Sequence, residues 1–352
     1  MLPGQQYMEQ GRLSPGNDML TYISESTGPL PPLPGTFSLP SLDVSHDDMV
    51  AFARTFDPQP FHIDEYAAQH TLLGGLSASA WYTCARISGL VDVALRDLGL
   101  GSELAGVEQI LLTAPVRAGD RLSGRIHLTT VVPCACGEAA CQGRVDVRNQ
   151  RGDLVMRMIL DLIVRQSAVS GATVSDGCRL RTPRSVRVDR IPREDVIRHF
   201  EEIGVGDEAV LGPYSFDAIR VDTFCTLTCN EQEHSGRSVG PWPLKVPNWH
   251  LPAAWMKCMI RYYEDEAARF AAQGLAVPRL GPAAGVKHLR WSRPVHIGET
   301  IVFRAWAERK MSIASQKDWG LLVVGAEGID SGGNVVVSFC PQMLIERAAS
   351  AA

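Results

Sequence analysis

The chain repeats itself at about half its length. The run TAPVRAGDRLSGRIHL at 113–128 matches SRPVHIGETIVFRAW at 292–306, because each places Pro-Val, then Gly and an acidic residue, before an alternating apolar stretch. Other matched segments have the same offset of roughly 170 to 180 residues, which is too long for a solenoid repeat. The repeat therefore predicts two related domains, and the length of 352 residues is long enough for both.

Both halves show the same order of expected elements. A helix rich in small and apolar residues is predicted at 77–95 in the first half, and a second helix at 251–273 in the other half. Strands with alternating apolar residues follow each helix, with no helices between them, and this arrangement is typical of an antiparallel sheet. A buried helix packed on a meander of strands places each half in the α+β class.

Changes in composition set the expected domain boundaries. Residues 1–37 are rich in Pro and Gly and are predicted to be a flexible arm. The first domain is expected at 38–166. The polar stretch 167–195 has no sustained periodicity and is interpreted as a linker, so the second domain is expected at 196–348.

Composition narrows the function. Apolar residues make up 45% of the chain and the net charge is −5, which fits a soluble globular protein and argues against a nucleic-acid surface. No apolar run is long enough to span a membrane, and the first residues do not resemble a secretory signal, so we expect a cytoplasmic location. Cys134, Cys136 and Cys141 lie close together, but a structural zinc site needs a fourth ligand. We therefore predict a loop there, and no metal.

The segment FDPQPFHIDEY carries the most informative polar residues. Asp57 and His62 are five positions apart, and Pro58 and Pro60 argue against a regular helix, so a stiff, extended loop is predicted. Asp64 would then cap a short helix that follows. A carboxylate and an imidazole held together can share a water, deprotonate it and return a proton to carbon. From the spacing alone, a turn with a buried histidine remains an alternative.

The run FARTFDPQPFHIDEYAA, followed by LLGGLSASAWYT, resembles the signature of MaoC-like dehydratases, the group that contains the (R)-specific enoyl-CoA hydratases. Asp57, His62 and Asp64 match the motif of that family, and the similarity covers about residues 38–166. The resemblance implies hotdog domains, each an antiparallel sheet wrapped around a central helix. The two halves would then form a pseudo-dimer within one chain.

The resemblance also implies an activity. Asp57 and His62 would bind the water that adds to a 2-enoyl thioester or leaves a 3-hydroxyacyl thioester. The backbone N–H of Ala80, where the family usually has Gly, would bind the thioester oxygen. The expected partner is an acyl-CoA or acyl-carrier-protein thioester, so coenzyme A enters only as part of the substrate and no metal or redox cofactor is needed. Three side chains are candidates for the pocket wall: Ser79, Trp81 and Ser88.

The second half has lost part of the motif. An offset of about 172 residues places Cys229 against Asp57 and His234 against His62, and a neutral thiol is a poor proton acceptor, so no hydration is predicted there. His250 is a weak candidate for a ligand contact, and a surface or helix-start position is the alternative. The run KHLRWSR supplies possible contacts to CoA phosphates, with a solvated strand face as the alternative: Lys287, Arg290 and Arg293.

Two other functions remain open at this point. A thioesterase would direct the activated water to the carbonyl carbon, and hotdog folds host that reaction as well. A non-catalytic acyl-thioester-binding or structural protein is suggested by the altered second half and by Ala80. Fold alone does not separate these functions, because the site decides. The sequence also leaves open whether the fused pair associates further.

Overall fold

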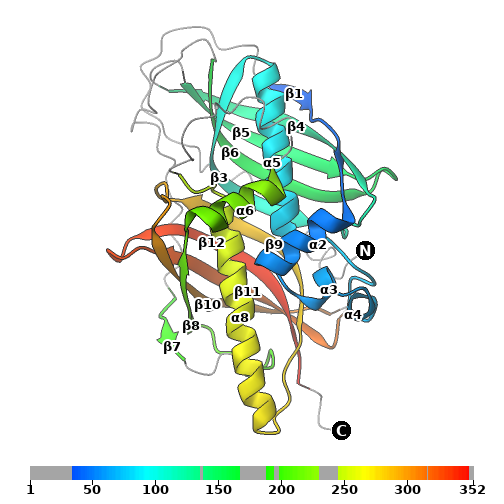
Figure 1. The fold of residues 1–352 in the computed structure, drawn as a ribbon, viewed down its shortest axis with the longest axis vertical. Helices are drawn as coiled ribbons and strands as arrows, with labels where there is room; N and C mark the ends of the chain where they lie inside the picture. Colours follow the sequence, from blue (N-terminus) through cyan, green and yellow to red (C-terminus); the bar gives the residue numbers. More distant parts are fainter. Residues whose placement is uncertain are drawn as a thin grey trace.

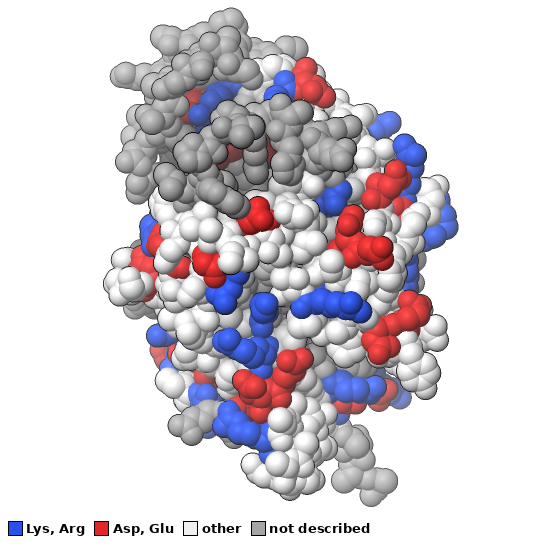
Figure 2. Space-filling model, in the orientation of Figure 1, with Lys and Arg blue, Asp and Glu red and all other residues white. Residues whose placement is uncertain are grey.

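The computed structural model describes residues 34–134, 138–166, 188–193, 198–229, 245–314 and 316–348. Within these ranges, no helix is long and apolar enough to cross a membrane. On the face drawn in Figure 2, acidic and basic side chains are interspersed among uncharged ones.

A continuous sheet of twelve strands runs through both halves (Figure 1). The strand order is β1-β4-β5-β6-β3-β9-β12-β11-β10-β8-β7, with β2 paired to β4. All pairs are antiparallel except β7 with β8. The strands of the first half are β1 (Gly35–Ser38), β2 (Leu42–Asp43), β3 (Leu100–Leu112), β4 (Arg121–Pro133), β5 (Glu138–Arg148) and β6 (Leu154–Gln166). Those of the second half are β7 (Ile191–Pro192), β8 (Asp207–Ser215), β9 (Leu280–Trp291), β10 (Thr300–Ser312), β11 (Trp319–Ile329) and β12 (Val335–Glu346).

Each half places one long helix against its part of the sheet, as Figure 1 shows for α5 and α8. The helix α5 is buried along most of its length, in keeping with its small and apolar sequence, whereas the last turns of α8 carry charged residues and reach solvent. The helices are α2 (His46–Phe56), α3 (Pro60–Ile63), α4 (Glu65–Gln69), α5 (Ala80–Asp97), α6 (Ala218–Thr228) and α8 (His250–Ala272). The predicted α+β class and both predicted long helices are therefore confirmed.

Equivalent elements of the two halves meet at the centre of the molecule. The strands β3 and β9 pair antiparallel, with Ile110 opposite Val286. The helices α2 and α6 pack together as well, where the rings of Phe52 and Phe224 lie 6.1 Å apart, edge to face. Because equivalent elements of the two halves pair at both contacts, the halves are related by an approximate two-fold axis, as expected of a pseudo-dimer within one chain.

Two short strands modify the expected boundaries. The strand β1 begins at Gly35, so residues 35–37 belong to the sheet and not to the arm, because their backbone pairs with β4. Similarly, β7 lies inside the segment assigned to the linker and pairs with β8 at the edge of the sheet. The expected loop at the cysteine cluster lies where β4 ends and β5 begins, and Cys136 itself is outside the described residues.

Candidate active site

Asp57 is held in one orientation at the end of α2. Its backbone N–H donates to Ala53 O at 2.8 Å, so the residue caps the helix, and its side chain is buried, with 2% of the residue exposed. Gln59 Nε2 donates to Oδ1 at 2.8 Å and Ser79 Oγ donates to Oδ2 at 2.7 Å. Donors on both oxygens fix the plane of the carboxylate.

His62 lies beside this carboxylate, with Nε2 3.4 Å from Asp57 Oδ2. Its Nδ1 lies 2.7 Å from the carbonyl oxygen of Ser77. A carbonyl oxygen only accepts, so Nδ1 must carry the proton of a neutral ring. The neutral imidazole therefore directs an unprotonated Nε2 toward Asp57 and toward any molecule between them.

The prediction of an extended loop around these two residues was wrong in one respect. Pro60 begins the short helix α3, which carries His62. Proline is compatible with the first helical position, since its missing N–H would have no partner there and its φ is already helical. The N-cap role predicted for Asp64 is confirmed, because its side chain accepts from the backbone N–H of Ala67 at 2.8 Å.

The first turn of α5 supplies a backbone donor. Ser79 is the N-cap of this helix, and its Oγ accepts from Trp81 N at 3.3 Å while it donates to Asp57. Ala80 is the first helical residue, where a backbone N–H has no partner within the helix. Among the described residues, none accepts a hydrogen bond from that N–H. An unpaired donor at the positive end of a helix dipole suits an oxygen that gains negative charge.

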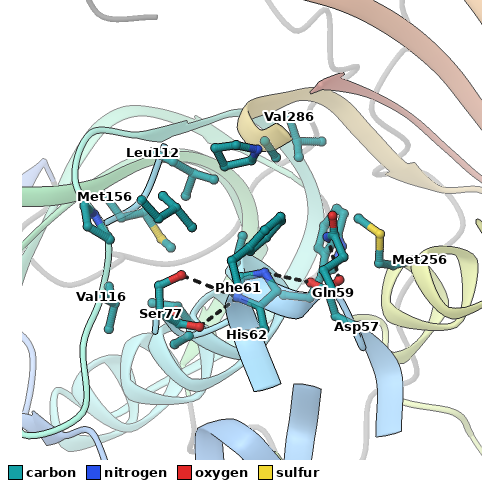
Figure 3. Close-up of a pocket in the computed structure, with 18 of the residues that line it drawn as sticks. Asp57, Gln59, Phe61, His62, Ser77, Leu112, Val116, Met156, Met256 and Val286 are labelled. Atoms are coloured by element: carbon teal, nitrogen blue, oxygen red, sulfur yellow. Dashed lines mark hydrogen bonds and ion pairs between the residues drawn. The ribbon is translucent and has the colours of Figure 1, made fainter. Parts of the chain in front are cut away.

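These groups open into a pocket of about 870 Å³, its open mouth included. Figure 3 shows Asp57, Gln59 and His62 on one side of the pocket and apolar side chains facing them. Both halves contribute to the wall. The first half provides Asp57, Gln59, Phe61, His62, Leu73, Ser77, Ala78, Ala80, Trp81, Thr83, Leu112, Ala114, Pro115, Val116, Val155 and Met156. The second half provides Met256, Gly281, Pro282, Ala283, Val286, Pro341 and Met343.

The structure does not bring all the candidate wall residues to this pocket. Trp81 lines it and packs edge-on against Phe339 of the second half, with ring centroids 5.6 Å apart. Ser79 is fully buried behind the pocket, where it holds Asp57. Ser88 lies about two turns further along α5 and is not a lining residue. Gln59 was not singled out in the sequence, although it follows Asp57 by only two positions.

The two arginines proposed to bind CoA phosphates are both engaged in ion pairs within the chain. Arg290 lies 2.7 Å from Glu108 and 3.1 Å from Asp161, so it joins the two halves. Arg293 contacts the carboxylates of Glu299 and Asp330 at 2.7 and 2.8 Å, and its hydrogen bond lowers the pKa of Asp330 to about 2. Lys287 is half-buried on β9. A phosphate-binding role for these three residues stays a prediction.

The second half has no equivalent pair among the described residues. Cys229 caps α6 with its N–H on Cys225 O at 2.8 Å, just as Asp57 caps α2, while His234 lies outside the described residues. His250 begins α8, where Ala80 begins α5, and is completely buried. It was expected at a helix start or the surface, and only the helix start is confirmed.

Aromatic rings enclose His250 on several sides. The ring of Phe224 stacks on the imidazole at 4.6 Å, and Phe216 and Phe56 contact it edge-on at 4.9 and 5.2 Å. Tyr214 Oη lies 3.2 Å from Nε2. Burial lowers the pKa of His250 to about 3, so the ring is neutral at physiological pH. The imidazole is therefore part of the core between α2, α6 and β8.

Comparison with known proteins finds similarity to a known family in the first half of the chain. Residues 34–146 match the family described as MaoC like domain. A MaoC-like dehydratase from Rhodospirillum rubrum is 34% identical over 38% of this chain and 93% of its own, with a TM-score of 0.35. The comparison with curated proteins found no match.

Two solved structures match almost the whole chain. A MaoC-domain protein from Chloroflexus aurantiacus, described as a dehydratase, covers 90% of this chain and 96% of its own at 15% identity, with a TM-score of 0.66. A conserved Mycobacterium tuberculosis protein with a double hotdog fold covers 88% and 96% at 14% identity, with a TM-score of 0.58. The fold is thus a double hotdog, as predicted. The segment that matches the MaoC like domain, residues 34–146, carries Asp57 and His62.

Proposed function

We propose that the chain is a hydro-lyase that hydrates a 2-enoyl thioester or dehydrates a 3-hydroxyacyl thioester, and that Asp57 and His62 activate the water. The observation that supports this most directly is the buried Asp57–His62 pair, with atoms 3.4 Å apart, at the polar side of an apolar pocket. The MaoC-like domain supports the same class of reaction.

The geometry of the pair suits a shared water. One water can donate a proton toward the bare Nε2 of His62 and the other toward Asp57 Oδ2, so the lone pairs of its oxygen face the substrate. Hydration then forms a bond from this oxygen to carbon 3 and transfers a proton to carbon 2. Both groups lie on the same side of the pocket, so the addition is syn. The reverse sequence removes water from a 3-hydroxyacyl group.

The N–H of Ala80 completes the proposed site. During addition the thioester carbonyl gains enolate character, and a fixed N–H at a helix N-terminus stabilises that charge without reorganising. The methyl group of Ala80 leaves the backbone donor in place. The remaining wall is apolar and comes from both halves, which favours an acyl chain. The carrier is CoA or an acyl carrier protein, and the proposed chemistry requires no metal or redox cofactor.

The test is hydration of crotonyl-CoA and a longer 2-enoyl-CoA, followed by loss of the enoyl-thioester absorbance. We expect Asp57→Asn and His62→Ala each to lower kcat by roughly 10²- to 10⁴-fold. Matched controls are Asp47→Asn and His70→Ala, which alter exposed residues of the same domain and should keep the rate within about two-fold. Activity that is indifferent to both site substitutions would refute the mechanism.

The same reactions separate the alternative functions. A thiol reagent added to the assay detects free CoA, so a thioesterase would release thiol at a rate that depends on Asp57. A non-catalytic acyl-thioester binder would bind an acyl-CoA without either reaction. The open pocket beside Asp57 favours catalysis over a purely structural role, because side chains do not fill it.

A further inference from the structure

The loop between α4 and α5 carries two elements of the proposed site. Ser77, near the end of this loop, provides the carbonyl that fixes the tautomer of His62, and Leu73 lines the pocket. The middle of the loop is Gly74-Gly75, with φ of +62° and +142°. Consecutive glycines with positive φ have many backbone alternatives in the unfolded chain, so the loop needs contacts from elsewhere to adopt one conformation.

Arg117 supplies these contacts from the turn between β3 and β4. Its Nη1 donates to Leu76 O at 2.7 Å and its Nη2 donates to Leu73 O, so one planar group holds the carbonyls on both sides of the two glycines. The backbone of Arg117 is itself anchored, because its N–H donates to Asp120 Oδ2 at 2.8 Å. A methyl group on Gly75 would lie 3.1 Å from Nη1, so the loop is shaped to admit the guanidinium.

We propose that Arg117 is a positioning residue for the hydration site, because it fixes the loop whose Ser77 carbonyl sets the proton position on His62. The effect on rate rests on the proposed function, whereas the effect on the His62 ring does not. A guanidinium is suited to this role, since its rigid fork can donate to two carbonyls at once and it stays charged when half-buried. The ammonium of a lysine would reach one carbonyl or the other.

The expected effect is moderate. Ser77 keeps a second anchor, because its N–H donates to Phe61 O at 3.1 Å, and the next residue, Ala78, donates to Val116 O at 2.9 Å. The loop should therefore shift in the absence of Arg117 without leaving the site. A displacement of about 1 Å in a catalytic group costs up to roughly 10²-fold in rate. We expect Arg117→Ala to lower kcat by roughly 10- to 100-fold.

The experiment uses the full chain with Arg117→Ala and Arg117→Lys, and Arg148→Ala as the control. Arg148 also donates to a backbone carbonyl, that of Gly152, but it lies in an exposed hairpin. Kinetics are compared for crotonyl-CoA and crotonyl-pantetheine, which has no phosphates. Ring ¹⁵N NMR of labelled protein reports the His62 tautomer, with His62→Ala to assign its signals. The activity of Arg117→Ala is also measured with guanidinium chloride at millimolar concentration, and the same concentration of sodium chloride is the control.

The proposal predicts an equal loss with both substrates for Arg117→Ala, a smaller loss for Arg117→Lys, partial rescue by guanidinium and no loss for Arg148→Ala. It also predicts that the His62 signals leave the Nδ1-protonated pattern in Arg117→Ala. A loss confined to crotonyl-CoA would overturn it, since Arg117 would then bind phosphate. Unchanged His62 signals would overturn it as well.

If the wild type hydrates neither substrate, the proposed function fails, but the NMR comparison still decides the role of Arg117. If Arg117→Ala does not fold, Arg117→Lys answers the same questions.

Discussion

The two halves of the molecule present the same elements at equivalent places and use them differently. In the first half, the residue that caps α2 is a carboxylate and the first residue of α5 is Ala80, which leaves a pocket open. In the second half, the capping residue is Cys229 and the first residue of α8 is His250, whose ring is buried among aromatic side chains. The proposed acid of the first half is therefore a thiol in the second half, and the long helix there begins with a buried imidazole.

The second half also takes part in the candidate site. Its strands β9 and β12 and the helix α8 provide the far wall of the pocket, so the second domain replaces the partner that a single hotdog would need. At the start of α8, His250 stacks on Phe224 and contacts Phe56 of the first half. An aromatic cluster thus joins the two copies beside the helices that carry their first motifs.

The largest expected effect concerns the acid that the second half lacks. Asp57→Asn should lower kcat by roughly 10²- to 10⁴-fold, whereas Cys229→Ala should leave it within about two-fold. Adding Cys229→Asp to Asp57→Asn should restore nothing, because Cys229 does not line the pocket that Asp57 lines. Enoyl-CoA hydration measured for the three variants checks this. Recovery of activity in the double variant would show that the second half still holds a working site.

The next effect is a dependence of stability on pH. The pKa of His250 is about 3 in the folded chain, against 6.5 when it is exposed. Between these values the unfolded chain binds a proton that the folded chain does not, so stability falls as the pH drops from 6.5 toward 3. The slope from this residue is about 1.4 kcal/mol per pH unit. Above pH 6.5 the residue contributes no slope.

Replacing His250 with Phe tests this directly. Urea unfolding at pH 7 and at pH 5 should show a difference in stability that is about 2 kcal/mol smaller for His250→Phe than for the wild type. The unpaired hydroxyl of Tyr214 changes the absolute stability of the variant but adds no slope in this range, since burial raises the pKa of Tyr214 far above it. Arg220 and Lys257 are the charged neighbours that also disfavour protonation of His250, and both are retained in the variant. An equal pH dependence in the two proteins would contradict a neutral, buried His250.

Sequence reasoning reached the residues whose roles depend on local spacing. Asp57, His62 and the cap at Asp64 were found because they lie within one short motif, and the repeat gave the pairing of Asp57 with Cys229. It missed contacts between distant segments. The carboxylates that neutralise Arg290 come from the other half, and the guanidinium that holds Leu73 and Leu76 is about forty residues away. No local pattern marks such pairs, because only the folded sheet brings them together.

The hydrogen bond from Ser79 to Asp57 should have a smaller effect than the pair itself. Ser79→Ala removes this donor and the N-cap of α5, so we expect kcat to fall by roughly ten-fold and stability by about 1 kcal/mol. Ser45→Ala is the matched control, because Ser45 caps α2 in the same way but does not touch Asp57. It should lose similar stability and keep its rate. Equal rates for both variants would show that Ser79 serves only as the N-cap of α5 and that its hydrogen bond to Asp57 does not affect the rate.

The smallest expected effect concerns whether the second half helps to select the length of the acyl chain. Ala283 on β9 lines the pocket, while its neighbour Ala284 packs in a separate apolar cluster. Ala283→Leu should lower kcat/KM for a longer 2-enoyl-CoA by roughly 3- to 10-fold and change crotonyl-CoA less, because one pocket side chain contributes about 1 to 3 kcal/mol at most. Ala284→Leu should not change the ratio of the two substrates. If both variants leave that ratio unchanged, the acyl chain does not reach the wall from the second half, and the two halves are linked by packing alone.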